Sequence, residues 1–333
     1  MASIISKKYS IVQIALFSTI FSTITCGLLY YFLERKNEEA LITNSAKYCD
    51  YSVKRIQGFK FVKPILWVDE NCESDNLAGT KRKITEIIDK YKQMNGVTNT
   101  SVYLRTGPQW TVVNENEKYQ PGSLFKVPVL ITILKMDEEN PGFLNKVISY
   151  KNPIQVDKKL NFPSKTIQLG SSYTIKELLT FMIKYSDNVA TVLLEQNMKN
   201  EILQKLFSDI GLEVPNAYSS EYLFTAKDYS LFMRTIFNAS YLSSENSEFA
   251  AELLSECNFK DGIEKGIPSN TKIAHKFGEA GSNDEKQLHE SAVIYLGDKG
   301  YLLTVMTKGK DIKTLSSLIG EISRAVYNDV SSK

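Results

Sequence analysis

Ser123 and Lys126 stand three positions apart within PGSLFKVPVL, a stretch that is otherwise apolar apart from its first turn-forming residues. An ammonium group is costly to bury unless it is paired or gives up its proton. A lysine without that proton is a base, and a base beside a serine hydroxyl turns the hydroxyl into a nucleophile. If a helix begins near Gly122, both side chains share one face, close to unpaired backbone N–H groups that favour developing negative charge. The stretch therefore predicts a serine nucleophile that a neutral lysine activates.

A Ser-x-x-Lys spacing is weak evidence alone, because a helix-capping serine followed by a lysine that keeps its charged end in water gives the same pattern. Two further fragments strengthen the case. YSDNVAT holds Ser186-Asp187-Asn188 between two helical stretches, and AHKFGEAG holds Lys276-Phe277-Gly278 on a β-rich stretch. Ser-x-x-Lys, Ser-Asp-Asn and Lys-Thr-Gly in this order are the signature of class A β-lactamases and penicillin-binding proteins.

The chain from about Ala78 to Tyr327 thus resembles the serine β-lactamase and penicillin-binding protein superfamily, and class A enzymes most of all. LHESAVIY, after the third motif, is similar to the strand that follows that motif in class A enzymes. The resemblance implies a catalytic role for three residues: Ser123 as the acylated nucleophile, Lys126 as its base or proton relay, and Ser186 as the proton donor to the leaving nitrogen.

The resemblance also implies a set of substrate-binding residues. Asn188 would hold the substrate's amide side chain and Lys126, while Lys276, followed by Gly278, would place positive charge beside Ser186 and the substrate carboxylate. The backbone N–H groups of Ser123 and Glu279 would form the oxyanion hole. Asp187 would be structural.

Two departures from the family pattern matter for function. Phe277 stands where threonine or serine is usual, so a hydroxyl that helps to hold the substrate carboxylate is missing, and the ring is expected to face away from the cleft. Class A enzymes also carry Glu-x-x-Leu-Asn on an omega loop, and that glutamate activates the water that removes the acyl group. No such motif lies between Ser186 and Lys276. Glu213 and Glu221 are the nearest candidates, and a solvated loop carboxylate is the favoured interpretation of each.

The periodicity of apolar residues predicts a mixed α/β (α+β) domain. A helix over 78–96 and a hairpin of strands over 100–106 and 109–115 come first. Helices then follow over 123–136, 174–185, 189–198, 201–210, 226–237 and 243–256, and strands over 271–279, 290–297 and 301–309 precede a last helix over 312–327. We expect a five-stranded antiparallel sheet flanked by the N- and C-terminal helices, with an inserted all-helical lobe and a cleft between the two parts.

The N-terminal segment differs from the rest of the chain. Residues 10–33 contain no charged side chain over 24 positions, which is long enough to cross a bilayer as a helix. We expect a transmembrane anchor there, a cytoplasmic N-terminus over 1–9, a stalk and extended arm over 34–77, and an extracytoplasmic hydrolase domain over 78–330. A cleaved signal peptide is the alternative. Cys49 and Cys72 could form a disulfide in an oxidising compartment, or remain free thiols.

The composition of the chain limits the classes of protein to which it can belong. The chain has 333 residues, of which 43% are hydrophobic and 23% charged, with a net charge of +2. These values favour neither general disorder nor a nucleic-acid partner. Two histidines and four scattered cysteines give no metal-ligand spacing, so we expect no cofactor, and we expect a monomer.

Three functions remain open from the sequence. The first is a membrane-anchored hydrolase of the class A β-lactamase type that acylates Ser123 with a β-lactam or related amide and hydrolyses the acyl-enzyme slowly. The second is a penicillin-binding-like D-alanyl peptidase or transpeptidase that acts on peptidoglycan peptides. The third is a non-catalytic protein that binds cell-wall peptides or a partner protein. The presence of both Ser123 and Lys126 speaks against the third.

Overall fold

The structure is a computed structural model that describes residues 21–33, 50–94, 96–156, 161–162, 165–214, 222–297 and 299–332. The chain divides into two compact units, Met1–Asp50 and Tyr51–Lys333. In the first unit, residues 21–33 are helical and exposed. Among the described residues, no helix has both the length and the apolar character that a bilayer crossing needs. The predicted anchor over 10–33 lies partly outside the described residues and stays a prediction.

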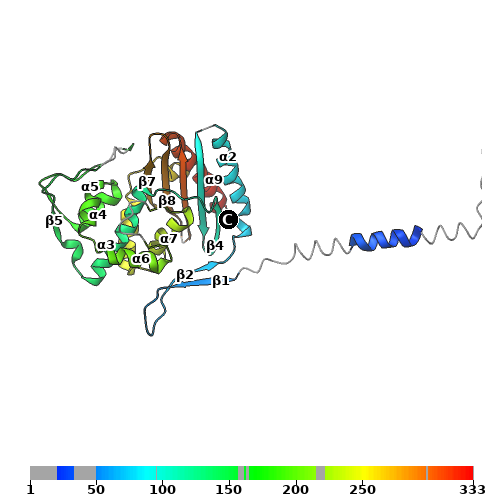
Figure 1. The fold of residues 1–333 in the computed structure, drawn as a ribbon, viewed down its shortest axis with the longest axis horizontal. Helices are drawn as coiled ribbons and strands as arrows, with labels where there is room; N and C mark the ends of the chain where they lie inside the picture. The colour runs from blue at the N-terminus through cyan, green and yellow to red at the C-terminus, as the bar shows by residue number, and fades with distance from the viewer. Residues whose placement is uncertain are drawn as a thin grey trace, which may run out of the picture. The chain divides into compact units, whose positions relative to one another are not determined.

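A five-stranded antiparallel sheet forms the centre of the second unit, as predicted, with the strand order β4-β3-β9-β8-β7 (Figure 1). Its strands are β3 (Val97–Thr106), β4 (Gln109–Val113), β7 (Ile273–Gly281), β8 (Lys286–Leu296) and β9 (Lys299–Gly309). β7, which carries the third motif, is an edge strand, so one side of its backbone is not paired within this sheet.

Helices cover both faces of this sheet. α2 (Ala78–Gln93) and α9 (Ile312–Ser331), the predicted first and last helices of the domain, lie together on one face (Figure 1). Ile84 and Ile88 lie one turn apart on α2 and are buried in a hydrophobic core with the apolar side of α9. α7 (Ala226–Phe237) packs against the other face.

The remaining helices form the predicted helical lobe. They are α3 (Lys126–Glu139), α4 (Ile175–Lys184), α5 (Asn188–Glu195), α6 (Asn200–Ile210) and α8 (Ser244–Ser255). Short 3-10 turns, η1 (Asp75–Leu77), η2 (Gly122–Phe125), η3 (Phe143–Asn145) and η4 (Ile263–Gly266), and a small strand pair, β5 (Val147–Ser149) with β6 (Ser172–Thr174), connect these parts. α3 is buried along most of its length, which explains why its sequence is apolar almost all round.

Side-chain caps fix where several of the described helices begin, α7 and α4 among them. The hydroxyl of Thr225 accepts a hydrogen bond from the Asp228 backbone N–H at the start of α7, as the Thr-x-x-Asp pattern there favours. A full capping box, not predicted from the sequence, starts α4: Thr174 accepts from the Glu177 backbone N–H, and the Glu177 carboxylate accepts from that of Thr174.

The segment before the domain is more regular than expected. β1 (Tyr51–Arg55) and β2 (Ile65–Glu70) form an antiparallel hairpin where a stalk and an extended arm were predicted. The guanidinium groups of Arg105 and Arg234 both donate to Asp69 Oδ1, at 2.6 and 2.7 Å, and so fix β2 to the domain. No local sequence pattern predicts these contacts, because they join residues that are far apart in the chain.

The three cysteines that the structure describes differ in state. Cys72 is disulfide-bonded, while Cys26 and Cys257 are free. Cys49, the partner suggested for Cys72 by the sequence, lies outside the described residues.

Candidate active site

The candidate nucleophile lies in a single 3-10 turn that runs directly into α3. Ser123 belongs to η2, and Lys126 is the first residue of α3. Residues three apart overlie each other in a 3-10 turn, so the two side chains point the same way. Pro128 falls in the first turn of α3, where a proline ring removes no helical hydrogen bond. The predicted helix start near Gly122 is therefore confirmed, with a 3-10 turn in place of the first α-turn.

Lys126 is buried and surrounded by oxygen atoms. Its Nζ lies 2.9 Å from Ser123 Oγ, 2.7 Å from the Ser186 carbonyl oxygen and 2.6 Å from Asn188 Oδ1. A neutral amine has two N–H donors and one lone pair. If the two donors serve the Ser186 carbonyl and the Asn188 amide oxygen, which can only accept, the lone pair is left for the Ser123 hydroxyl.

The electrostatics favour that neutral form. Burial lowers the pKa of Lys126 to well below its usual range, and the nearby charge of Lys276 lowers it further. The negative charges of Asp187 and Glu195 oppose this shift. An amine of depressed pKa with its lone pair toward Ser123 is able to act as the base for that hydroxyl.

Ser186 lies between the two lysines. Its Oγ is 3.2 Å from Lys126 Nζ and 3.0 Å from Lys276 Nζ. Its backbone has a φ of 55°, a left-handed conformation that non-glycine residues seldom adopt. Such backbone strain persists only where the surrounding structure holds it.

Asp187 provides part of that support. Its carboxylate caps α5 through the Val189 N–H and accepts from the Ile167 N–H and the Thr166 hydroxyl. These bonds tie the Ser186 turn to the segment before α4. The structure thus places Asp187 in a supporting position, in line with the role expected of it.

Lys276 is fully buried on β7. Its Nζ donates to Ser186 Oγ and, at 3.0 Å, to the Phe277 carbonyl oxygen. Burial lowers the pKa of Lys276 to about 8. The group therefore remains largely charged at neutral pH, next to the hydroxyl that Lys126 also contacts.

Close backbone packing holds β7 against η2. A Cβ on Gly278 would overlap the Pro121 carbonyl oxygen and the Leu124 backbone nitrogen, and a Cβ on Gly122 would overlap the Glu279 carbonyl. Gly122 also has a φ of 53°, which glycine adopts without strain. The two glycines therefore allow the backbones of Ser123 and Glu279, the predicted oxyanion-hole residues, to come together.

Side chains of β7 alternate between the two faces of the sheet. Ala274 packs in the core of the helical lobe, and Lys276 and Gly278 share its face, whereas Phe277 lies in the core beneath α2 and α9. The Phe277 ring stacks on Phe259 with centroids 4.3 Å apart and meets Phe162 edge-on. The ring also lies beneath the Lys276 ammonium, whose Nζ is 4.3 Å from the ring centroid, so it supports the lysine that reaches Ser186.

Glu279 shares the Phe277 face and has partners that the sequence did not reveal. Its Oε2 accepts hydrogen bonds from the backbone N–H and the side-chain amide of Asn161. Its Oε1 is buried and has no hydrogen-bond partner among the described residues. Asn161 has no motif or periodicity that would have identified it.

The carboxylates considered as bases for deacylation lie in different surroundings. Glu213 is exposed, and Glu221 lies outside the described residues. Glu195, which the sequence reasoning missed, interacts electrostatically with Lys126. It lies seven residues after Asn188 on α5, two turns along the same face. That spacing is the signal that could have identified it.

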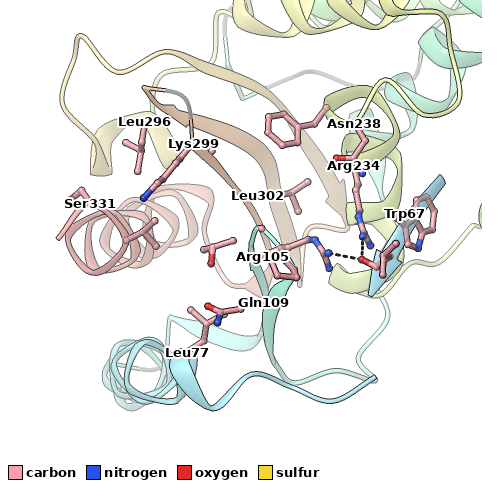
Figure 2. Close-up of a pocket in the computed structure, with 17 residues that line it drawn as sticks. Trp67, Leu77, Arg105, Gln109, Arg234, Asn238, Leu296, Lys299, Leu302 and Ser331 are labelled. Atoms are coloured by element: carbon pink, nitrogen blue, oxygen red, sulfur yellow. Dashed lines mark hydrogen bonds between the residues drawn. The ribbon is translucent and has the colours of Figure 1, made fainter. Parts of the chain in front are cut away.

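A cavity of about 980 Å³ lies apart from these residues, lined in part by the β3–β4 and β8–β9 turns and the end of α9 (Figure 2). None of the motif residues lines it. Arg105 and Arg234 point toward each other at its side, and both donate to the Val68 carbonyl oxygen. Their contacts with β2 account for these two buried charges.

No cluster of histidine, cysteine, aspartate or glutamate in the described part of the chain has the arrangement of a metal site. The donor set around Ser123 consists of lysine amines, hydroxyls and amide oxygens. Amines that serve as donors or bases do not form a site of the kind that binds divalent metal ions.

The sheet, the helical lobe and the lysine-flanked Ser123 define the class of protein: the fold is that of the serine β-lactamases and penicillin-binding proteins. Residues 79–330 match the Beta-lactamase enzyme family, and the chain belongs to this family. A comparison with curated proteins finds no match.

Solved structures agree with this fold. A mutant of PBP-A, solved as an acyl-enzyme complex with penicillin G, is similar with a TM-score of 0.63 and 19% identity, over 76% of this chain and 97% of that one. A β-lactamase from Chitinophaga pinensis DSM 2588 has a TM-score of 0.65 and 17% identity, over 76% and 99%. A class A representative from Bacteroides cellulosilyticus DSM 14838 has a TM-score of 0.64 and 18% identity, also over 76% and 99%.

Proposed function

We propose that the protein is a membrane-anchored, extracytoplasmic serine hydrolase of the class A β-lactamase type, which acylates Ser123 with a β-lactam or related amide and hydrolyses the acyl-enzyme slowly. The observation that carries the proposal is the environment of Lys126, whose amine lies 2.9 Å from Ser123 Oγ with two acceptor oxygens on its other sides. The predicted anchor over 10–33 belongs to the same proposal.

In the acylation step, Ser123 Oγ bonds to the carbonyl carbon and its proton passes to the neutral Lys126 amine. The N–H groups of Ser123 and Glu279 stabilise the oxyanion, at roughly 3–4 kcal/mol for each donor. The C–N bond then breaks, and Ser186 protonates the leaving nitrogen and regains a proton from Lys126. Ser186 is suited to this transfer because its hydroxyl lies within 3.2 Å of both lysine amines.

Deacylation requires water to attack the ester carbon while the bond to Ser123 Oγ breaks. The missing Glu-x-x-Leu-Asn motif supports a slow step here. It also favours a second candidate function, a penicillin-binding-like peptidase or transpeptidase with a long-lived acyl-enzyme. The PBP-A complex with penicillin G shows an acyl-enzyme in a protein of similar fold.

The test is to incubate the full chain with a chromogenic β-lactam and, separately, with a fluorescent penicillin. Release of the chromophore over many turnovers supports a β-lactamase, whereas a stable label on Ser123 without turnover supports the penicillin-binding candidate. Ser123→Ala should abolish both signals, and Ser172→Ala, an exposed serine on β6, should change neither. If the wild type gives neither signal, the acylation proposal is wrong and the non-catalytic binder is favoured.

The sequence prediction for Glu221 can be tested in the same assay. Glu221→Gln should change deacylation little. A loss of about a thousandfold, which is typical of a removed catalytic base, would identify Glu221 as that base.

A further inference from the structure

The hairpin of β1 and β2 contacts the domain with one face and leaves the other face exposed. Side chains alternate along a strand, so Trp67 and Asp69 both point toward the domain, where the Arg234 guanidinium contacts each of them. Val68, between them, and Val53, its partner on β1, point the other way and are 41% and 44% exposed. The outer face of the hairpin is therefore apolar and accessible.

The tip of the hairpin, residues 57–63, is exposed at every position. Three of its side chains are large and apolar: Phe59 is 56% exposed, Phe61 is 88% exposed and Val62 is 57% exposed. Figure 1 shows this tip projecting from the domain. Apolar side chains that gather on an exposed surface, with polar residues around them, mark an interaction site.

The charges of the tip are all positive. Lys60 and Lys63 are exposed, and Lys60 Nζ lies 5.1 Å from the centroid of the Phe61 ring. Residues 51–65 contain no acidic side chain. Aromatic and aliphatic groups interleaved with lysines suit the boundary of a bilayer, because the apolar groups enter it while the ammonium groups stay among anionic headgroups.

The size of the tip favours a lipid surface over a protein partner. A stable protein interface buries about 800 Å² on each side, which takes roughly 20–30 residues. Residues 57–63 provide far fewer. A membrane needs no matching surface, since a few inserted apolar side chains and nearby basic residues are sufficient to hold a segment on it.

The hairpin also lies close to the proposed anchor along the chain. Residues 34–50 separate Leu33 from Tyr51, where β1 begins. A segment of this length spans at most about 60 Å, at roughly 3.5 Å for each residue. The hairpin of an anchored chain can therefore reach the bilayer, and the tether keeps its effective concentration there high.

We infer that the tip of the β1–β2 hairpin docks on an anionic bilayer surface, with its three apolar side chains between headgroups and acyl chains and its two lysines among the headgroups. This inference rests on the proposed anchor over 10–33. Because Arg105 and Arg234 fix β2 to the domain through Asp69, a docked tip restrains how the hydrolase domain is oriented at the membrane.

The experiment uses the full chain with Phe61→Trp as a reporter, reconstituted into vesicles. One set of vesicles is phosphatidylcholine alone and the other contains phosphatidylglycerol as well, each with and without phospholipid brominated on its acyl chains. Bromine quenches tryptophan emission only at close contact. Met94→Trp, at a 63% exposed site at the C-terminal end of α2, is the control reporter. The wild type gives the emission of the buried Trp67 and Trp110.

Brominated lipid should quench most of the emission that Phe61→Trp adds in the anionic vesicles, and less of it in the neutral ones. The emission that Met94→Trp adds should be quenched in neither. Raising the salt concentration from about 0.1 M to about 1 M should weaken the quenching, because the screening length falls from about 10 Å to about 3 Å.

Charge reversal tests the role of the lysines. Lys60→Glu with Lys63→Glu, added to Phe61→Trp, should reduce the quenching to that of the control reporter. Lys92→Glu with Lys151→Glu is the matched control, since both are exposed lysines outside the hairpin, and it should leave the quenching unchanged. Thermal unfolding should be the same for all of these proteins, because every changed side chain is exposed.

The outcomes separate the two proposals. If the full chain does not float with either set of vesicles, the proposed anchor is wrong and the docking is overturned with it. If the chain floats but Phe61→Trp is quenched no more than Met94→Trp, or if charge reversal leaves the quenching unchanged, docking on anionic lipid is overturned while the anchor stands. A blue shift of the emission without quenching would show that protein covers the tip, and would overturn the docking as well.

Discussion

Lys126 and Lys276 approach one atom: their Nζ groups lie 3.2 and 3.0 Å from Ser186 Oγ. Two ammonium groups so close in a buried site repel, and this repulsion favours loss of one proton. Burial and the Lys276 charge lower the pKa of Lys126 to well below its usual range, while burial lowers the pKa of Lys276 to about 8. The lowered pKa of Lys126 favours its neutral, basic form, whereas a pKa of about 8 leaves Lys276 largely charged at neutral pH.

The first prediction concerns the pH dependence of acylation. Lys126 must be neutral to accept the Ser123 proton, so the rate should rise with pH through the depressed pKa of Lys126. Lys276 should be charged, so the rate should fall as pH rises through about 8. The second-order acylation rate, measured from pH 5 to about 10 with a neutral β-lactam amide, should follow a bell-shaped curve.

A charge-preserving variant tests whether Lys276 causes the fall in the acylation rate at alkaline pH, which is the alkaline limb of the profile. Lys276→Arg keeps its positive charge throughout this range, so the decline near pH 8 should disappear. The thermal stability of this variant should be measured as well, because the arginine must fit a fully buried position and the variant has to be folded for the comparison. An unchanged alkaline limb in a folded variant would show that Lys276 does not cause the decline.

The second prediction concerns Glu195. Its negative charge raises the pKa of Lys126 and so opposes the effect of burial. Glu195→Gln should therefore lower the pKa of Lys126 and move the acid limb of the acylation profile to lower pH. Glu201 is an exposed glutamate on α6, and Glu201→Gln is the control that should leave the acid limb of the profile unchanged. A shift to higher pH, or none, would contradict the assigned interaction.

Much of this site follows from local sequence signals. Ser123 and Lys126 are brought together by a single turn, so their three-residue spacing is sufficient to predict the contact. The sheet and its covering helices follow from apolar periodicity, and Gly122 and Gly278 stand where two backbones touch.

Other features depend on contacts between distant segments, which periodicity does not encode. The hydrogen bonds of Glu279 come from Asn161, more than a hundred residues earlier in the chain. The regular β1–β2 hairpin depends on the two arginines that hold Asp69. The Phe277 position departs from its family motif, and the ring's partners, Phe259 and Phe162, lie on separate segments.

The third prediction concerns acid stability and rests on His289. The Thr307 backbone N–H donates to its Nδ1 at 3.1 Å, so Nδ1 must be unprotonated, and Nε2 lies 3.0 Å from the Gln120 carbonyl oxygen. Burial lowers the pKa of His289 to about 3. Between pH 6.5 and 3 the unfolded chain binds a proton that the folded chain excludes, so folding stability should fall as pH falls through this window.

Urea unfolding at pH 7 and 4.5 measures this effect. His289→Gln should lower stability at pH 7, because Thr307 loses its acceptor. When the pH is lowered from 7 to 4.5, the variant should nevertheless lose about 3 kcal/mol less of its free energy of unfolding than the wild type does. This difference corresponds to about 1.36 kcal/mol for each pH unit below 6.5, the usual pKa of histidine. Equal losses in the two proteins would show that His289 is not the group that titrates.

The fourth prediction concerns Phe277, where the family motif would have threonine or serine. Phe277→Thr restores the usual residue type but removes a ring that is 3% exposed and stacked on Phe259. We expect a loss of roughly 3–5 kcal/mol in the free energy of unfolding, the range for truncation of a buried aromatic ring. Phe61→Thr, at a site that is 88% exposed, is the control and should change stability by less than about 0.5 kcal/mol.

The same variant separates packing from substrate binding. The side chain at position 277 is buried against Phe259 and Phe162, so the added hydroxyl should not speed acylation by a carboxylate-bearing β-lactam more than a few-fold. Urea unfolding and the second-order acylation rate are measured on the same preparation. A large gain in that rate with little loss of stability would show that the ring occupies the substrate cleft and not the core.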